Sequence, residues 1–342
     1  MKRNLVTGAN GLLGAHVMLE LLKRGQQVRA LVRAGSERSD VLAFFKRFDG
    51  QGGQLATQIE WQEADITDLP VLEEAVAGLD QVFHCAGYVS FEKKDRAQLL
   101  RINEGGTANI VSACLQHQVR LCHVSSVAVL HNLDCKEALS ETVFWKRSGR
   151  ESDYAISKYN AEREVWRGIE EGLEAVIVNP SVILAAGFWT RSSSRMMDTV
   201  YKGNPFYTAG TTGYVAASDV AEVMVELMDR GVSGERYILA EGNYTYRQMF
   251  SWMAEALGKP APRWSISKAA LRMAGIGERL LARLSGRPSR ISPDIVNSAF
   301  NTQVYSSEKV RQTLNFKFMS IQELVKQAGR VYLEDRENAP PR

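Results

Sequence analysis

A tyrosine and a lysine four residues apart, Tyr154 and Lys158, are the pair in this chain best suited to proton chemistry. Residues i and i+4 share one face of a helix, so both side chains would project together from a helix over 154–170. A phenol has a pKa of about 10, but a nearby ammonium group stabilises the phenolate and lowers that pKa. The spacing is common by chance, and it gains weight from Ser125 and Ser126 at the end of an earlier predicted strand.

Three glycines, Gly8, Gly11 and Gly14, follow the first predicted strand and lead into a predicted helix. Glycine is needed where a turn is tight, where backbone approaches a pyrophosphate and where the helix packs on its strand. The start of the helix then offers N–H groups and a positive dipole end. A glycine-rich turn without a ligand is the alternative. The candidate cofactor-binding residues of this turn are Gly8, Asn10, Gly11, Leu12, Leu13 and Gly14.

Arg33 ends the second predicted strand, where an NAD-binding fold normally places an acidic residue that accepts the ribose 2′-OH. An arginine can instead pair with a 2′-phosphate, so Arg33 predicts NADP (NADPH), with NAD as the less favoured cofactor. Ser36 and Arg38 could add phosphate contacts or simply be exposed loop residues, and Arg33 itself could be a surface residue.

Asp65 and Ile66 follow the third predicted strand. A carboxylate here can accept a hydrogen bond from the adenine amino group, and an aliphatic side chain can flank the ring. The competing interpretation makes Asp65 a turn residue or a helix cap.

The elements that must position these residues alternate between short β-branched runs and longer helical patterns, which predicts βαβ units. Right-handed crossovers then give an α/β fold with a doubly wound parallel sheet, the Rossmann fold. We expect strands at 4–6, 27–32, 59–63, 81–85, 121–125 and 175–178. We expect helices at 12–24, 71–77, 97–116, 154–170, 218–229, 246–256 and 321–332.

Residues 1–180 are expected to form an NADP-binding Rossmann domain to which 216–240 return. Residues 181–215 and 241–335 are expected to form a smaller C-terminal substrate-binding domain, in which 187–214 resembles a substrate-side loop. A basic amphipathic segment at 264–290 holds six basic residues and one acid, Glu278. It predicts either a solvated helix face covering the small domain or a contact with a membrane surface or a partner.

Composition excludes several classes of protein. The 342 residues are 45% hydrophobic and 24% charged, as in a folded globular protein, and a net charge of +3 gives no reason to expect nucleic acid as a partner. No run of residues approaches a membrane span. Four cysteines without CxxC spacing predict reduced thiols and a cytoplasmic location. The pairs His84-Cys85 and Cys122-His123 could be imagined as metal ligands, but packing on two buried strands explains them better.

These sites together resemble the extended branch of the short-chain dehydrogenase/reductase superfamily, which has a TGxxGxxG turn, a serine near the fifth strand and YxxxK. Nearly the whole chain is covered, because further matches follow in the same order. They are Phe83-His84-Cys85-Ala86-Gly87, Asn103-Glu104-Gly105-Gly106-Thr107, Asn179-Pro180, Tyr305-Ser306-Ser307-Glu308-Lys309 and Leu314-Asn315-Phe316.

The resemblance implies roles for particular residues. Ser126 would hydrogen-bond the reacting oxygen, Tyr154 would exchange its proton, and Lys158 would bind the nicotinamide ribose while tuning Tyr154. Cys85 and Ala86 would line that ribose, and Pro180 would lie by the carboxamide. Asn103 would be structural, at a kink near the triad, or a helix-capping residue.

The stretch at 28–33 is similar to the NADPH-using dihydroflavonol-4-reductase group, which includes reductases of aldehydes and ketones. The leading hypothesis is therefore NADPH-dependent reduction of a small-molecule carbonyl substrate. The alternatives are an NAD-dependent hydroxysteroid-type dehydrogenase or nucleotide-sugar epimerase, and a non-catalytic NADP(H)-sensing protein. Val127-Ala128 after Ser126 disfavours sugar dehydration, because dehydratases of the family carry an acidic pair there. Family members often pair through two helices, here about 97–116 and 154–170, so a homodimer is possible.

Overall fold

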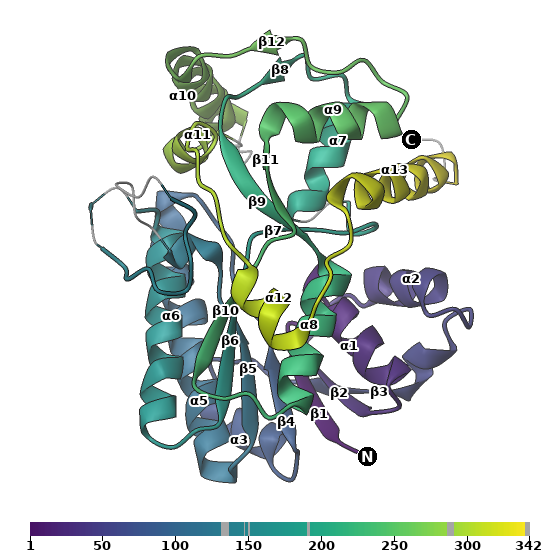
Figure 1. Cartoon of the computed structure of the whole chain (residues 1–342), viewed down its shortest axis with the longest axis vertical. Coiled ribbons are helices and arrows are strands. Elements are labelled where there is room, and N and C mark those ends of the chain that lie inside the picture. Colours follow the sequence, from purple (N-terminus) through teal and green to yellow (C-terminus); the bar gives the residue numbers. More distant parts are fainter. Residues whose placement is uncertain (131–136, 147, 150, 190–191, 286–290, 339–342) are drawn as a thin grey trace.

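A computed structural model describes residues 1–130, 137–146, 148–149, 151–189, 192–285 and 291–338. Its central feature is a seven-stranded sheet in the order β10-β6-β5-β4-β1-β2-β3, in which every pair of neighbours is parallel. The doubly wound Rossmann fold is thereby confirmed (Figure 1). The strands are β1 (Arg3–Thr7), β2 (Gln27–Val32), β3 (Ile59–Glu63), β4 (Gln81–His84), β5 (Arg120–Val124), β6 (Ala175–Pro180) and β10 (Glu235–Leu239).

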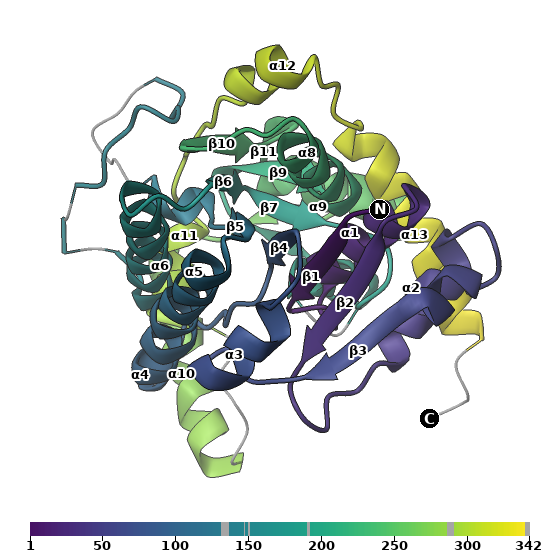
Figure 2. The ribbon, with the colours of Figure 1, turned by 90° about the horizontal axis from the view of Figure 1, so that it is seen from below.

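Helices cover both faces of this sheet, as the view along it in Figure 2 shows. Successive strand residues point to opposite faces, and neighbouring side chains therefore join different cores. Val6 and Phe83 pack under one face, whereas Leu5 and Val82 pack under the other. On the first face lie α1 (Leu12–Lys23) and α8 (Ala217–Asp229); on the second lie α3 (Leu69–Val76), α5 (Gly106–His117) and α6 (Asp153–Glu170).

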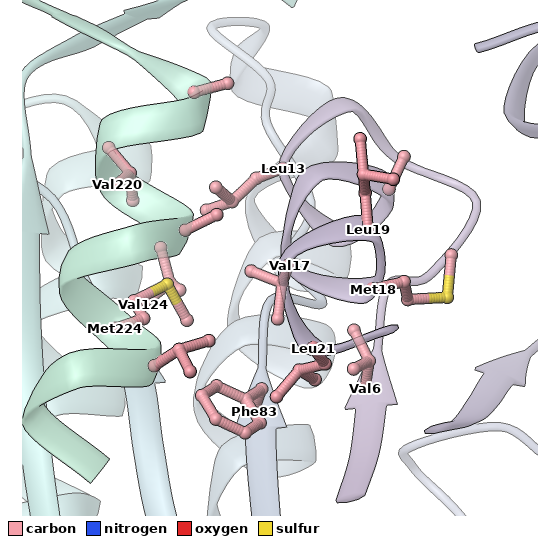
Figure 3. Packing of buried hydrophobic residues seen from close by; sticks show 14 of the residues in the cluster. Val6, Leu13, Val17, Met18, Leu19, Leu21, Phe83, Val124, Val220 and Met224 are labelled. Carbon is pink, nitrogen blue, oxygen red and sulfur yellow. The ribbon is translucent and has the colours of Figure 1, made fainter. Parts of the chain in front are cut away.

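The α1–α8 layer fixes the helix that follows the glycine turn. Leu13 and Val17 of α1 interdigitate with Val220 and Met224 of α8 above Phe83 (Figure 3). All five side chains are at least nine-tenths buried. Burying an aliphatic or aromatic side chain contributes roughly 1.5–3 kcal/mol, so this layer holds α1 firmly against the sheet.

The helix expected at 97–116 is not a single α-helix. α4 (Arg96–Leu99) passes into the π-helical turn η3 (Leu100–Gly105) before α5 begins. The buried Asn103 side chain hydrogen-bonds the backbone of Tyr88 through both its Oδ1 and its Nδ2. Helical periodicity alone cannot predict this contact, because Tyr88, the partner of Asn103, lies on another segment of the chain.

A smaller layer sits above the carboxyl ends of the strands (Figure 1). The region 187–214, expected to be a loop, instead holds regular elements because its apolar residues pack on later helices. The sheet here orders β11 (Gly242–Thr245), β9 (Thr211–Ala216) and β7 (Val182–Leu184), and β8 (Phe206–Tyr207) pairs with β12 (Trp264–Ser265). The helices of this layer are α7 (Arg195–Tyr201), α9 (Tyr246–Ala256), α10 (Lys268–Ser285), α11 (Pro293–Ser298) and α13 (Ile321–Glu337). The short helix α12 (Glu308–Leu314) packs instead against α8 and β10 of the central sheet.

Another element absent from the expected set is α2 (Ser39–Phe48), which packs Phe44 and Phe45 into the α1 layer. Among the described residues, no helix is long and apolar enough to cross a membrane, and no group of three or more metal-binding side chains gathers. The imidazoles of His84 and His123 instead lie together inside the sheet, 5.3 Å apart. Cys85, Cys114 and Cys122 are free thiols, and Cys135 lies outside the described residues.

Candidate functional site

The turn between β1 and α1 requires glycine for steric reasons. A Cβ on Gly14 would lie 2.3 Å from the Gly8 carbonyl oxygen, and Gly8 itself has a φ of +64°. A Cβ on Gly8 would meet the Ala86 nitrogen at 2.7 Å. No side chain caps the start of α1, where Gly11 is the N-cap residue. The first turn of α1 therefore presents backbone N–H groups at the positive end of a helix, an arrangement suited to a phosphate.

A cavity of about 810 Å³ adjoins this turn at the carboxyl ends of β2 and β3. Asn10, Arg33 and Asp65 all line it. Arg33 is exposed, and among the described residues its guanidinium forms no ion pair. Arg38 is different, because its guanidinium lies 3.4 Å from Glu63 and stacks 4.8 Å over the Trp61 ring. The structure therefore leaves Arg33, rather than Arg38, free to meet an anion.

Asp65 acts as a turn residue in this structure. Its Oδ1 accepts hydrogen bonds from the Thr67 backbone N–H at 2.9 Å and from the Thr67 hydroxyl at 2.8 Å. These bonds hold the pKa of Asp65 below its usual value, and Arg101 and Arg33 add to the effect. Ile66 is buried, and its side chain occupies the space that a Cβ on Gly106 of α5 would need.

The ends of β1 and β4 are joined by buried hydrogen bonds. The Thr7 hydroxyl accepts a bond from the Ala86 N–H at 3.1 Å and is bonded to His84 Nδ1 at 2.7 Å. Burial lowers the pKa of His84 to about 3, so its ring is neutral at physiological pH. These contacts hold Cys85 and Ala86 against the glycine turn. Pro180, the last residue of β6, is buried at the same edge of the sheet.

Ser126, Tyr154 and Lys158 meet at the carboxyl end of β5. Ser126 follows that strand, and its Oγ accepts a bond from the Ala128 N–H at 3.1 Å. The Ser152 hydroxyl caps α6 by accepting from the Ala155 N–H, which places Tyr154 in the first turn and Lys158 in the next. The Ser126 hydroxyl lies close enough to the Tyr154 phenol to lower its pKa, and the Lys158 ammonium donates to the Val124 carbonyl at 2.6 Å.

The electrostatics of the site favour a protonated phenol. Burial raises the pKa of Tyr154 above its ordinary value, and the hydrogen bond from Ser126 offsets only part of that effect. Burial lowers the pKa of Lys158 to about 8, while the negative charge of Glu162 opposes the shift. At neutral pH Tyr154 holds a proton that it can donate, and Lys158 carries an ammonium group four residues further along the same helix.

Glu162 was not among the expected site residues, yet it holds the loop around Ser126 in place. The carboxylate is buried and accepts bonds from Ser125 Oγ at 2.6 Å and from Asn179 Nδ2 at 2.8 Å, and it pairs with Arg236 at 3.1 Å. Asn179 also donates to the Ser126 carbonyl at 3.2 Å. The sequence carries one signal for Glu162, which is its position four residues after Lys158 on the same helix face.

Asn103 is linked to the backbone of Tyr154 through Ser157. Its Nδ2 donates to the Ser157 hydroxyl at 2.9 Å, in addition to the bonds to the Tyr88 backbone. Ser157 in turn donates to the Tyr154 carbonyl at 2.8 Å. Asn103 lies within a π-helical turn and does not cap a helix. The geometry therefore fits a structural role at a kink in the helix and does not fit a helix cap.

The pKa of Lys158 sets an expected pH dependence. We expect kcat/KM for the cofactor, which reports ionisations of the free enzyme, to fall as the pH rises through about 8. The free energy of unfolding should change in the opposite direction and rise with pH over this range. The folded pKa lies below 10.5, so the destabilisation from this buried charge is present below pH 8 and disappears as the pH rises toward 10.5.

A charge variant on α6 tests the assignment of that ionisation. Glu162→Gln removes the carboxylate that raises the pKa of Lys158, so the falling limb should move to lower pH. Glu164→Gln, whose carboxylate pairs with Arg167 on the same helix, should leave the limb in place. Superimposable pH profiles for wild type and Glu162→Gln would show that another group titrates.

The sequence comparisons agree with this geometry. The model of the NAD dependent epimerase/dehydratase family matches residues 4–240. The chain belongs to this family. It is 32% identical over 269 residues to "Sterol demethylase protein B" of Methylococcus capsulatus, covering 77% of this chain and 76% of that protein. It is 30% identical over 334 residues to a "Putative dihydroflavonol 4-reductase" of Synechocystis, covering 94% and 92%.

Solved structures share the fold over nearly the full length of the chain. The crystal structure of gox2253 superposes with a TM-score of 0.80 at 27% identity and covers 98% of this chain and 99% of its own. The Thermus thermophilus UDP-glucose 4-epimerase complex with NAD has a TM-score of 0.73 at 21% identity and covers 97% and 99%. The resemblance to extended short-chain dehydrogenase/reductases, with relatives of the dihydroflavonol-reductase type, is confirmed. The chain is an NAD(P)-dependent oxidoreductase.

Proposed function

We propose that this protein is an NADPH-dependent reductase of an aldehyde or ketone, with Ser126, Tyr154 and Lys158 as its catalytic residues. The observation that carries the proposal is the placement of Ser126, Tyr154 and Lys158 at the carboxyl end of β5, where Ser126 acts on the Tyr154 phenol and Lys158 donates to the Val124 carbonyl. Relatives named as reductases support it, among them "Cinnamoyl-CoA reductase 1" of Petunia hybrida at 26% identity.

The residues present fit a dinucleotide. The tight turn, in which Gly8 and Gly14 leave no room for a Cβ against neighbouring backbone, and the uncapped start of α1 suit its pyrophosphate. Asn10, Leu12 and Leu13 belong to the same turn. At the far end Arg33, Asp65 and Ile66 would hold the adenosine moiety, and Cys85, Ala86, Lys158 and Pro180 would hold the nicotinamide end.

When bound, the reduced nicotinamide supplies a hydride to the carbonyl carbon. Ser126 would hydrogen-bond the carbonyl oxygen, and Tyr154 would donate its proton to that oxygen as negative charge develops. Lys158 would stabilise the phenolate that Tyr154 leaves behind. Glu162 acts through Lys158 and the Ser125–Ser126 loop, so it is a positioning residue. The raised pKa of Tyr154 favours this direction, because a reductase needs the phenol in its protonated form.

Arg33 supports NADPH as the cofactor. A hydrogen bond to a charged group contributes about 1.5–3 kcal/mol, so we expect Arg33→Ala to weaken NADPH binding by roughly 10- to 100-fold and to leave NADH binding unchanged. Titration calorimetry with both cofactors measures this. Arg38→Ala is the matched control, because its guanidinium is engaged by Glu63 and Trp61. Equal affinity of the wild type for NADPH and NADH would show that Arg33 does not bind the 2′-phosphate.

A panel of aldehydes and ketones, followed by the loss of NADPH absorbance, tests the reaction itself. Arg33 argues against an NAD-dependent hydroxysteroid-type dehydrogenase or epimerase, and the assembled hydroxyls argue against a non-catalytic NADP(H) sensor. Tight NADPH binding without turnover on the whole panel would favour the sensor. Turnover with NAD and a secondary alcohol, but none with NADPH, would favour the dehydrogenase.

We place the reductase in the cytoplasm, where thiols stay reduced, because Cys85, Cys114 and Cys122 are free thiols. We also propose that two copies of the chain associate as a homodimer through α5 and α6, which lie side by side on one face of the sheet (Figure 2). Sedimentation of the purified protein measures that association.

A further inference from the structure

α10 is attached to the rest of the protein along a narrow strip. Among the residues of α10 whose burial is described, 268–279 and 281, only Gly275 is buried. A Cβ on Gly275 would lie 2.9 Å from the Ile291 side chain, so the helix approaches the chain leading into α11 at this point. Over residues 268–279 and 281, most of the helix surface is thus free of contact with the described part of the chain.

The side of α10 that faces away from this contact is apolar. Met273 is 68% exposed, Ile276 46% and Leu281 68%. At 3.6 residues per turn, Met273 lies about 200° around the helix from Gly275, on the opposite side. Ala269, Ala270 and Gly277 share this outward side and are exposed as well. Amphipathic helices normally turn such a stripe toward the core, but the outward side of α10 has no partner among the described residues.

Exposed aromatic residues stand next to the start of α10. Trp264 is 65% exposed and Phe206 44%, and the two are paired between β12 and β8. Three residues separate Trp264 from Lys268, the first residue of α10. Figure 1 shows the β8–β12 ribbon and α10 together at the outer end of the small layer. We call Trp264, Phe206, Met273, Ile276 and Leu281 the α10 face.

Basic residues follow one flank of the same helix. Lys268, Arg272 and Arg279 fall within about 40° of one another around the helix axis, beside the apolar stripe. Glu278 is the single acid in the segment 264–290, against six basic residues. Arg287 and Arg290 lie outside the described residues.

We propose that the α10 face docks onto the surface of an anionic lipid bilayer. The charge pattern favours lipid over a second copy of the chain. In a dimer through this face, the basic residues of one copy would meet mainly the basic residues of the other, because the segment 264–290 holds a single acid. Lipid phosphates provide the complementary charge, Met273, Ile276 and Leu281 enter the acyl boundary, and Trp264 suits the interface. With no described helix able to cross a membrane, α10 would lie in the plane of the bilayer.

This face is connected to the candidate active site. α11 follows α10 in the chain, and burial raises the pKa of Asp294 in α11, with the neighbouring Asp153 adding to the effect. Asp153 directly precedes Tyr154. The docking itself does not depend on the proposed reductase activity.

Flotation with vesicles tests the docking on the full-length protein. We expect binding to vesicles of phosphatidylcholine and phosphatidylglycerol in equal parts, with much weaker binding to phosphatidylcholine alone. Each basic residue near an anionic surface contributes about fivefold in affinity, so Arg272→Gln with Arg279→Gln should weaken binding roughly 25-fold. Met273→Ser with Ile276→Ser should weaken it at least tenfold, and added salt should reduce it.

The matched control is Leu42→Ser, which removes a leucine that is 48% exposed on α2, far from α10 in the chain. It should bind vesicles as the wild type does, and all variants should keep the wild-type unfolding temperature. Equal binding to both vesicle types, or no binding to either, would overturn the proposal. So would self-association in lipid-free sedimentation that Met273→Ser with Ile276→Ser abolishes, in a protein that does not float with vesicles.

Discussion

Tyr154→Phe should lower kcat by roughly 10²- to 10⁴-fold, the usual contribution of a positioned proton donor, while NADPH binds as tightly as before. The phenol is the protonated group that meets Ser126, and burial keeps its pKa above the ordinary value. Removing one oxygen leaves the ring in contact with Phe91, whose centroid is 5.8 Å away, so the loss should be chemical rather than structural. Steady-state turnover with a carbonyl compound found in the panel, together with calorimetry of NADPH binding, separates the two effects.

The same substitution one residue beyond Lys158 provides the control. Tyr159→Phe also removes a phenol oxygen from α6, but the Tyr159 ring stacks on Trp145, 4.6 Å away, outside the triad. Its kcat should remain within about twofold of the wild type. Full turnover by Tyr154→Phe would end the assignment of this residue as the proton donor, and a parallel loss in Tyr159→Phe would point to damage to α6.

Gly14→Ala should lower kcat/KM for NADPH about 100-fold, because a shift of about 1 Å in a positioning element costs that much. The new Cβ would lie 2.3 Å from the Gly8 oxygen and 2.9 Å from the Ala9 Cα, and both are backbone atoms that no side-chain rotation can move aside. Either the turn or the start of α1 must move, and the N–H groups aimed at the pyrophosphate move with it. Fluorescence titration with NADPH gives the affinity, and thermal unfolding gives the stability.

Gly105→Ala is the matched control for this change. Gly105 has a helical φ of −62°, and a Cβ there would meet no atom within 4 Å. This variant should keep both NADPH affinity and unfolding temperature. If Gly14→Ala bound NADPH normally, the turn would not be the pyrophosphate site, whatever its effect on stability.

Features that depend on neighbouring residues in the chain were predictable. The three glycines mark a turn whose backbone conformation excludes a Cβ, and Tyr154 and Lys158 share a face through helix geometry alone. The alternating apolar runs predicted six strands of the parallel sheet, because a strand buried on both faces needs apolar residues on both. Regular elements in 187–214 were missed, since their apolar residues show no continuous period and are stabilised by packing on α9 and α13.

Contacts between distant segments could not be predicted. Glu162 receives Ser125, Asn179 and Arg236 from three other parts of the chain, and only the folded sheet brings them together. The π-helical turn at 100–105 likewise depends on the Tyr88 backbone, which Asn103 contacts across 15 residues of sequence.

By itself, then, the sequence determined the glycine turn, the Tyr154–Lys158 face and the doubly wound parallel sheet that brings them to one edge. Each of these follows from backbone geometry within a few residues or from burial of regular apolar patterns. The tertiary structure alone decided that Glu162 acts on Lys158, that Arg33 has no ion pair among the described residues while Arg38 is engaged, and that the apolar side of α10 faces outward. An amphipathic helix has the same residue pattern whether its apolar stripe meets the core or solvent, because what covers that stripe lies elsewhere in the molecule or outside it.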